Sequence, residues 1–276
     1  MRSQVEWNGL GKFMAEIGII GGSGFYEFLV GQEVAVETPF GEPSDKILLV
    51  EYAGKKIAFL PRHGKKHYLP PHQINYRANL FALQKLGVKQ IIAPSAVGSL
   101  KAAIEPGHFV ICDQFINFTR SRADTFFNGP KVAHISTAEP YCPELRGLAA
   151  KACADLEIVH HPKGTVLIID GPRFSTKAES NFFANYADVI NMTQYPEVVL
   201  ARELEMCYLN ISLVTDYDAG LQGRDDIKAV SGQDVARVFK ENNQKVQQVI
   251  LEIIKNLPVA KAPTCGCNSA LKHAFL

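Results

Sequence analysis

The stretch from Ile190 to Gly220 constrains the fold of this 276-residue chain most strongly. An apolar segment ends at Met192 and Thr193, and Pro196 follows at a position that suits the first turn of a helix. The segment Tyr208–Val214 is then almost continuously apolar, which is typical of a strand covered on both faces of a sheet. The pattern predicts a strand, a helix and a second strand of an α/β fold.

Two acidic residues, Asp216 and Asp218, directly follow the second strand. Carboxylates at the end of a buried strand cost free energy unless a partner offers them hydrogen bonds. A ligand that carries N–H groups would be such a partner. The two strand ends are therefore predicted to bring hydroxyl and carboxylate groups to one edge of the sheet.

Length and composition favour one large hydrophobic core, since 47% of the residues are hydrophobic. No change in composition marks a second domain. We therefore predict a single α/β domain at residues 15–258, with a central mixed β-sheet flanked by helices. A flexible leader at residues 1–14 would precede it, and a tail at residues 259–276 would follow it.

The net charge of +1 gives no broad attraction to nucleic acid or to an anionic membrane surface. No apolar run reaches the roughly 20 residues that span a bilayer, and the start of the chain lacks the pattern of a signal peptide. These features predict a cytoplasmic enzyme with neither nucleic acid nor membrane as a partner.

Six cysteines are too few and too scattered for the disulfide framework of a secreted protein. Cys265 and Cys267 are an exception, because two thiols one residue apart could form a strained local disulfide or bind a metal. We interpret this pair as a local structural or redox feature that takes no part in catalysis.

A glycine-rich turn at residues 21–24 follows a predicted strand at residues 16–20. Its backbone N–H groups and the Ser23 hydroxyl could converge on an anion such as phosphate. An ordinary tight turn is an alternative. A dinucleotide-binding fold is a weaker one, because Glu27 stands where its third glycine would be.

Two further segments offer donors to an anion. A predicted hairpin, with strands at 47–52 and 56–60, leads into Arg62 and His63, although a solvated basic loop is an alternative. A predicted strand at 90–93 leads into a turn with Ser95 and Ala96. With Ser23 and Thr193, these donors suit a tetrahedral oxyanion, and the two aspartates suit the N–H groups of a heterocycle, so a nucleoside would lie between them.

Four separate motifs make the sequence recognisable: Gly-Ile-Ile-Gly-Gly-Ser-Gly-Phe, Pro-Arg-His-Gly-(x)2-His, Asn-Met-Thr-Gln-Tyr-Pro-Glu and Thr-Asp-Tyr-Asp. Over residues 15–255 the chain closely resembles the methylthioadenosine phosphorylase branch of the trimeric purine nucleoside phosphorylases. The resemblance implies reversible phosphorolysis of 5′-methylthioadenosine to adenine and 5-methylthioribose 1-phosphate. It also implies a homotrimer, or a hexamer made of two trimers, that uses inorganic phosphate as co-substrate and needs no cofactor and no metal.

The resemblance assigns roles to individual residues of this sequence. The residues expected to hold phosphate are Ser23, Arg62, His63, Ser95, Ala96 and Thr193. The residues expected to contact the nucleoside are Met192 at the ribose, Asp216 and Asp218 at the adenine, Phe174 and Ser175 around the base, and Val235 at its border. His134 would reach the methylthio pocket of a neighbouring subunit. On the sequence alone, a surface histidine and a core phenylalanine are the simpler interpretations of His134 and Phe174.

Asp216 is the expected catalytic residue, because negative charge builds on the purine as its bond to the ribose breaks. A carboxylate also accepts a hydrogen bond from a 6-amino group, so adenine is favoured over hypoxanthine. Arg62→Ala is expected mainly to weaken the use of phosphate. The alternatives are a broader purine nucleoside phosphorylase, a methylthioinosine phosphorylase and, more distantly, a dinucleotide-binding protein.

Overall fold

The computed structural model describes residues 14–22, 31–221, 223–224, 226–258 and 264–275. Within these residues, eleven strands form one mixed sheet. The strands are β1 Ile17–Gly21, β2 Gln32–Val34, β3 Ile47–Tyr52, β4 Lys55–Pro61, β5 Gln90–Ser99, β6 Phe109–Val110, β7 Gln114–Asn117, β8 His160–His161, β9 Thr165–Ile168, β10 Val189–Asn191 and β11 Cys207–Asp216. The helices are α1 Tyr76–Lys85, α2 Pro143–Asp155, α3 Lys177–Phe183, α4 Gln194–Glu203 and α5 Gly232–Asn256, with short 3-10 helices η2 Pro71–Gln73 and η3 Cys267–Ser269.

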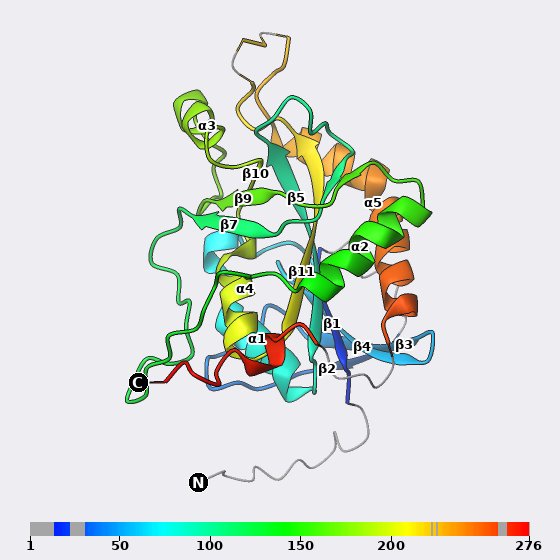
Figure 1. Cartoon of the computed structure of the whole chain (residues 1–276), viewed down its shortest axis with the longest axis vertical. Helices are drawn as coiled ribbons and strands as arrows, with labels where there is room; N and C mark the ends of the chain where they lie inside the picture. The colour runs from blue at the N-terminus through cyan, green and yellow to red at the C-terminus, as the bar shows by residue number, and fades with distance from the viewer. Residues whose placement is uncertain (1–13, 23–30, 222, 225, 259–263, 276) are drawn as a thin grey trace.

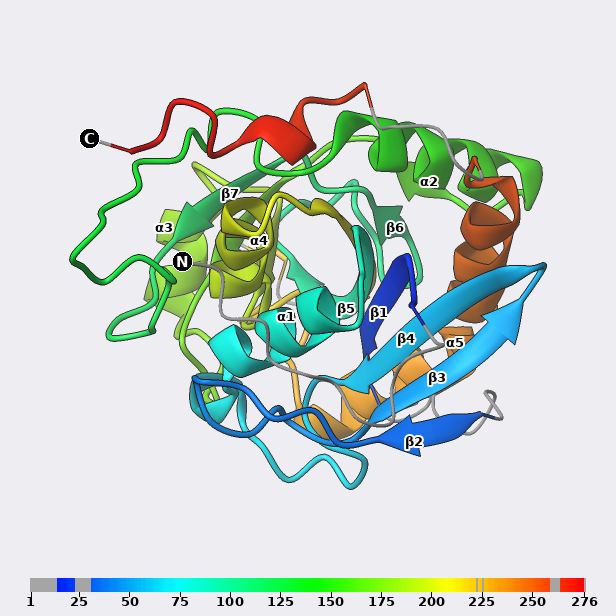
Figure 2. The same cartoon turned by 90° about the horizontal axis from the view of Figure 1, so that it is seen from below.

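Helices cover both faces of the sheet, as predicted. Helices α1 and α4 lie on one face, and α2 and α5 lie on the other (Figures 1 and 2). The strands supply both hydrophobic clusters by alternation, because successive side chains of a strand point to opposite faces. In β1, Ile20 packs with the α1 and α4 side, whereas Ile17 and Ile19 pack with the α2 and α5 side.

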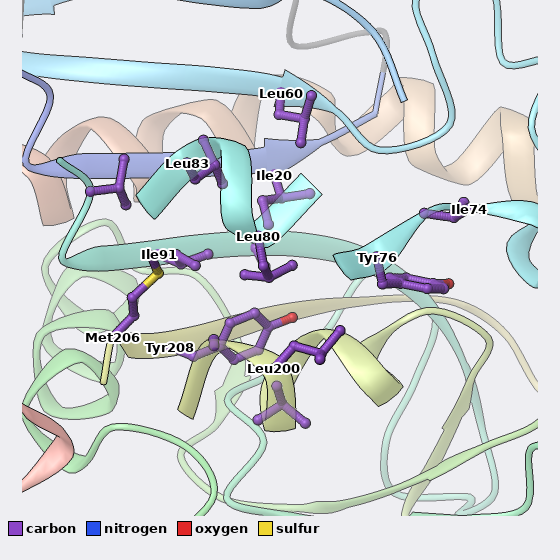
Figure 3. Packing of buried hydrophobic residues seen from close by; sticks show 14 of the residues in the cluster. Ile20, Leu60, Ile74, Tyr76, Leu80, Leu83, Ile91, Leu200, Met206 and Tyr208 are labelled. Atoms are coloured by element: carbon purple, nitrogen blue, oxygen red, sulfur yellow. The ribbon is translucent and has the colours of Figure 1, made fainter. Parts of the chain in front are cut away.

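The cluster on the α1 and α4 face supports the region where the predicted site residues lie. Figure 3 shows Leu80 and Leu83 of α1 and Leu200 of α4 pointing toward the strand residues of this cluster. Tyr208, the second residue of β11, lies among them and is almost fully buried. The packing holds α4 against β11, and therefore holds the start of α4 near the middle of the sheet.

The strand β5 is longer than the sequence predicted, because it continues through Ser95 and Ala96 to Ser99. The predicted turn at these residues is wrong. The reason is long-range pairing: β11 runs parallel to β5 from Gln90 to Gly98 and keeps the stretch after Pro94 extended. Pro94 is tolerated because neither β1 nor β10 pairs with β5 at this residue, so its missing N–H leaves no hydrogen bond of that edge unmade, and its carbonyl accepts from Arg62 Nη1 at 3.0 Å.

The sheet forks at β5. One edge of β5 pairs with β11 along its length, so β1 and β10 must share the other edge. There β1 pairs only with residues 90–92, and β10 pairs only with residues 98 and 99. Residues 93–97 thus face a gap in the ladder on that edge, which we call the fork.

Several local predictions are confirmed. Strands β3 and β4 form the expected hairpin, and Ala53 and Gly54 both have positive φ at its turn. Tyr195 has extended dihedral angles, so the regular part of α4 begins at Pro196 as predicted. Among the described residues, no helix combines the length and apolarity needed to cross a lipid bilayer.

Candidate active site

The fork brings three strand ends together. Strand β1 ends at Gly21, and its carbonyl accepts a hydrogen bond of 2.9 Å from the backbone N–H of Arg62, directly after β4. Strand β10 ends at Asn191, whose Nδ2 donates to the carbonyl of Ala96 at 2.9 Å. Predicted phosphate residues from β4, β5 and the loop after β10 therefore meet at one place. Ser23 lies outside the described residues.

Arg62 forms a buried ion pair at the fork with Glu197 of α4. Its Nε donates to Glu197 Oε2 and its Nη2 to Oε1, both at 2.9 Å, and the side chains are 3% and 0% exposed. Burial by itself would lower the pKa of Arg62, but the charge of Glu197 holds that pKa above its ordinary value. Tyr208 also donates its hydroxyl to Glu197 Oε1, at 2.7 Å.

Most of the Arg62 donors are already engaged. Nη2 also donates to the Ile20 carbonyl at 2.9 Å and Nη1 to the Pro94 carbonyl, so four of the five N–H groups have partners in the described chain. On the sequence, the planar guanidinium of Arg62 was expected to be available to phosphate, but Glu197 accepts two of its hydrogen bonds. Arg62 can offer an anion one N–H and a fixed position rather than a bidentate grip.

Ser95 lies in the interior of β5 and belongs to a buried polar network. Its hydroxyl is hydrogen-bonded to Asn210 Nδ2 at 3.0 Å, and Asn210 Oδ1 accepts from Ser212 at 2.7 Å. Gln194 continues the network by donating to Ser212 Oγ at 3.1 Å, and Tyr141 donates to Gln194 at 2.6 Å. Sequence reasoning missed this network, because alternating small polar residues in an apolar strand give no signal of their own.

Thr193 is held at the start of α4. Its backbone N–H donates to Asn191 Oδ1 at 2.7 Å, and its hydroxyl lies 3.3 Å from the same oxygen. The N–H of Gln194 also donates to Asn191 Oδ1, at 2.8 Å. Asn191 therefore holds the turn with its Oδ1 and binds β5 with its Nδ2. This explains how a short loop can present Thr193 at a fixed position.

His63 is half-buried beside Arg62, and its ring stacks on that of His67 with centroids 4.4 Å apart. Its Nδ1 lies 2.8 Å from the Leu69 carbonyl, which can only accept, so Nδ1 carries the proton. Burial lowers the pKa of His63 to about 4. At neutral pH the Nε2 atom of His63 is therefore a hydrogen-bond acceptor, and not the extra donor that was expected from the sequence.

Asp216 lies at the other end of this region, where β11 ends next to Gly98 of β5. Thr215 donates its hydroxyl to Asp216 Oδ2 at 2.7 Å, and the N–H of Asp218 donates to Oδ1 at 2.8 Å. A Cβ at Gly98 would lie 2.9 Å from Asp216 Oδ1, so glycine leaves room for the carboxylate. Burial raises the pKa of Asp216 to about 6.

Asp218 and Ser175 carry buried oxygen atoms that would be available to a ligand. Within the described chain, Asp218 Oδ2 and Ser175 Oγ are buried and have no hydrogen-bond partner. Burial raises the pKa of Asp218, and the nearby hydroxyls of Ser180 and Ser175 limit the rise. Ser175 lies close enough to Asp218 that a small shift of its hydroxyl would join the two, and hydrogen-bonding groups of a bound molecule would satisfy the oxygen atoms that remain.

Arg122 is a residue that sequence reasoning missed. It lies in a polar loop, yet its side chain is only 4% exposed. Its Nη1 donates to the Met192 carbonyl at 3.0 Å, its Nη2 donates to the Asp170 carbonyl at 3.0 Å, and its Nε lies 3.4 Å from the Asp170 carboxylate. Arg122 thus ties the turn at Met192 to the segment that leads to Phe174 and Ser175.

The remaining predicted residues lie around the base end or apart from it. Phe174 is 37% exposed, and Met192 is half-buried. Val235 is half-buried in the first turn of α5, and its neighbour Asp234 is close enough to contribute to the raised pKa of Asp216. His134 is exposed, and its N–H donates to the Ala274 carbonyl at 2.8 Å.

A cavity of about 570 Å³ lies between residues 124–137 and α4. Tyr195, Val199 and Glu203 line it from α4, but neither the donors at the fork nor Asp216 does. It is therefore separate from the candidate site.

The arrangement has two chemically distinct ends. Ala96 at the fork and Gly98 beside Asp216 are two residues apart on β5, a distance of about 7 Å along a strand. The fork presents hydroxyl, amide and guanidinium donors, which suit an anion. The other end presents two carboxyl groups of raised pKa, which can accept hydrogen bonds from a heterocycle, and Asp216, with a pKa of about 6, can hold a proton near neutral pH.

Comparison with known proteins identifies the family of this chain. The phosphorylase superfamily (PNP_UDP_1) matches residues 16–255. The S-methyl-5′-thioadenosine phosphorylase of Pyrococcus horikoshii is 52% identical over 264 residues, which cover 95% of this chain and 100% of that protein. A purine nucleoside phosphorylase of Streptomyces coelicolor is 47% identical over 270 residues, 94% of this chain and 95% of its own. A crystal structure of a methylthioadenosine phosphorylase from an antarctic soil metagenomic library superposes with a TM-score of 0.88 and 41% identity, covering 96% of this chain and 93% of that one.

Proposed function

Because the chain belongs to the phosphorylase superfamily, we propose that it catalyses the reversible phosphorolysis of 5′-methylthioadenosine to adenine and 5-methylthioribose 1-phosphate. The observation that carries the proposal is the pairing of an anion-binding fork with two buried carboxyl groups further along β5. Names given to relatives support it, since the relative from Pyrococcus horikoshii is an S-methyl-5′-thioadenosine phosphorylase.

In the proposed reaction, phosphate at the fork attacks C1′ of the ribose while the bond from C1′ to the purine nitrogen breaks. Ala96, Thr193 and Arg62 hold the phosphate in line with that bond. The entropy cost of bringing the two reactants together is therefore met on binding and not in the chemical step. His63, neutral with a free acceptor, takes a hydrogen bond from a protonated phosphate oxygen. Met192 packs against the sugar.

The leaving adenine takes up negative charge as the bond breaks. Asp216, whose pKa of about 6 keeps part of the population protonated near neutral pH, donates its proton to the ring. Asp218 accepts a hydrogen bond from the 6-amino group and the Ser175 hydroxyl donates to a ring nitrogen, through oxygen atoms that have no hydrogen-bond partner among the described residues. Phe174 stacks on the ring, and Val235 closes its border. No metal and no cofactor takes part in these steps.

We further propose a homotrimer in which His134 completes the methylthio pocket of a neighbouring subunit. The exposure of His134 supports this assignment. Mixing His134→Ala chains with chains inactive in their own site should restore part of the activity if the residue acts across subunits. Sedimentation analysis would give the number of subunits, and a monomer with full activity would contradict the assignment.

A panel of four nucleosides, each with and without phosphate, tests the reaction itself. Methylthioadenosine is expected to be cleaved fastest and only with phosphate, followed by adenosine, while methylthioinosine and inosine lag. The similarity to a purine nucleoside phosphorylase makes broad specificity the second candidate, and equal rates for the 6-amino and 6-oxo pairs would favour it. Base release without phosphate would contradict both.

Thr193→Val is expected to weaken phosphate use with little change in stability. The hydroxyl has one weak internal hydrogen bond, of 3.3 Å to Asn191, so its loss leaves the fold almost unchanged. A hydrogen bond to a charged group contributes about 1.5–3 kcal/mol, which corresponds to roughly a tenfold or larger rise in KM for phosphate. Phosphate saturation curves would measure it, and an unchanged KM would remove Thr193 from the phosphate site.

A further inference from the structure

Four cysteine side chains from distant parts of the chain converge on the side of the molecule away from the fork. Their sulfur atoms all lie within 4.8 Å of one another, and one pair, Cys207 and Cys265, is 3.5 Å apart. All are buried except Cys265, which is half-buried. The members of this cysteine cluster are Cys142, Cys207, Cys265 and Cys267.

Two members belong to the rigid core. Cys142 is the N-cap of α2, and its N–H donates to the Tyr208 carbonyl at 2.9 Å. Cys207 is the first residue of β11, and its N–H donates to the Lys89 carbonyl at 2.9 Å. The two sulfur atoms are therefore placed by a helix and a strand that would form whether or not the tail were present.

The other two members come from residues 264–275, the described part of the C-terminal tail. Gly266 between them has φ +70°, a conformation that glycine adopts readily and that turns both thiols toward the core. The tail has its own attachments: Thr264 N donates to Glu144 Oε1 at 2.7 Å, and Leu271 N donates to Glu205 Oε1 at 3.1 Å. The second half of the cluster is thus also held in position.

The spacing of the sulfur atoms matches tetrahedral coordination. Zinc binds thiolates at about 2.3 Å, which places the four sulfurs of a tetrahedral site about 3.8 Å apart. Two separate disulfides would require only that sulfurs be close in pairs, whereas here each sulfur lies within 4.8 Å of the other three. We propose that the cysteine cluster binds one zinc ion and thereby fastens the tail to the core.

The protonation chemistry of the cluster is consistent with this site. Four thiols release four protons as Zn²⁺ binds, or fewer where a thiolate is already present, and the complex carries two negative charges. The N-terminus of α2, at Cys142, favours negative charge.

The zinc ion would stabilise the fold and would take no part in the reaction at the candidate active site. The tail ends beside residues 133 and 134, where Ala133 forms a β-bridge with Phe275 and His134 donates to the Ala274 carbonyl. A zinc ion at the cluster therefore fixes the tail at one end, and the bridge fixes it at the other. Removal of the metal should free the tail before the core unfolds.

The test is the metal content of the full chain, purified under reducing conditions without chelator. We expect about one zinc ion per chain, and a roughly tenfold or greater loss in Cys265→Ser/Cys267→Ser. Cys153→Ala is the matched control, because Cys153 is buried in α2 outside the cluster and should leave the zinc content unchanged. Cobalt exchanged into the wild-type site should show the absorption bands of tetrahedral cobalt bound to four thiolates.

A second readout does not depend on how well the variants fold. Stripping the wild-type chain of metal should expose the tail to proteases while the core stays resistant, and adding zinc back should restore protection. An intact mass four hydrogens lower than that of the reduced chain, with no bound metal, would show two disulfides and overturn the proposal. Free thiols that fail to take up zinc or cobalt would also overturn it.

Discussion

Replacing Glu197 with Ala is expected to lower the free energy of unfolding by about 3–5 kcal/mol, the usual cost of leaving a buried charge without its partner. Arg62 would then stand 3% exposed with no carboxylate, and Tyr208 would lose its acceptor. Urea unfolding monitored by circular dichroism would measure the loss. A decrease below about 1 kcal/mol, the range of exposed pairs, would show that the pair is not buried in solution.

Two further variants separate the ion pair from phosphate binding. Arg173→Ala breaks an exposed bidentate Arg–Glu pair, with Glu179, and leaves the capping box of α3 at Thr176 and Glu179 in place, so the loss should stay below about 1 kcal/mol. Arg62→Met/Glu197→Leu replaces the buried charges with apolar side chains and should recover much of the stability. Turnover that depends on phosphate should stay lost in that double variant, because it no longer carries the guanidinium.

Replacing Asp216 with Asn is expected to reduce kcat/KM for methylthioadenosine by roughly tenfold to a hundredfold, with a smaller loss for methylthioinosine. The amide cannot donate an acidic proton to the ring, and its NH₂ group faces a 6-amino group that also donates. Asp226→Asn, an exposed residue of the following loop paired with Arg224, is the matched control and should have no effect. An unchanged ratio of the two substrates would refute the role of Asp216 in recognising the amine.

The pH dependence offers an independent check on Asp216. Because its pKa is about 6 in the folded chain and 3.8 ordinarily, the folded state binds the proton more tightly. The stability that this provides is fully present below pH 4 and is lost as pH rises through 6, by up to about 3 kcal/mol. Asp216→Asn should abolish that part of the pH dependence, which unfolding curves between pH 4 and 8 would detect. In the unsubstituted chain kcat/KM is expected to fall as pH rises through 6, because Asp216 then loses its proton, and Asp216→Asn should lack this fall.

The sequence predicted the helices and strands around the site better than it predicted which strands pair and which side chains bind each other. Apolar periodicity was enough for the longer buried strands, the hairpin and α4, because those elements depend on local burial, but it did not predict the short strands β2, β7 and β8. The fork was not predictable in this way, since β5 extends past Pro94 only because β11, over a hundred residues later, pairs with it. Glu197 lies 135 residues from Arg62 in the sequence, and nothing in the residues around either one indicates that they form an ion pair.

This difference changes how one variant should be interpreted. On the sequence, Arg62→Ala isolates phosphate binding. In the structure, the same change leaves the Glu197 carboxylate buried without its cation, so a fall in activity would combine unfolding with lost phosphate contacts. Thr193→Val is the cleaner probe, because its hydroxyl supports little else.

The forked sheet also suggests how relatives with different base preferences can share one scaffold. In the proposed site the oxyanion binds where the backbone ladders separate, so altering its binding means changing the register of strands in the core. The proposed position of the nucleobase is at the end of β11 and the loops around it, where single side chains can be exchanged without disturbing the ladder. Diversification should therefore concentrate at that end of β11, while the ladder opening itself stays architecturally fixed.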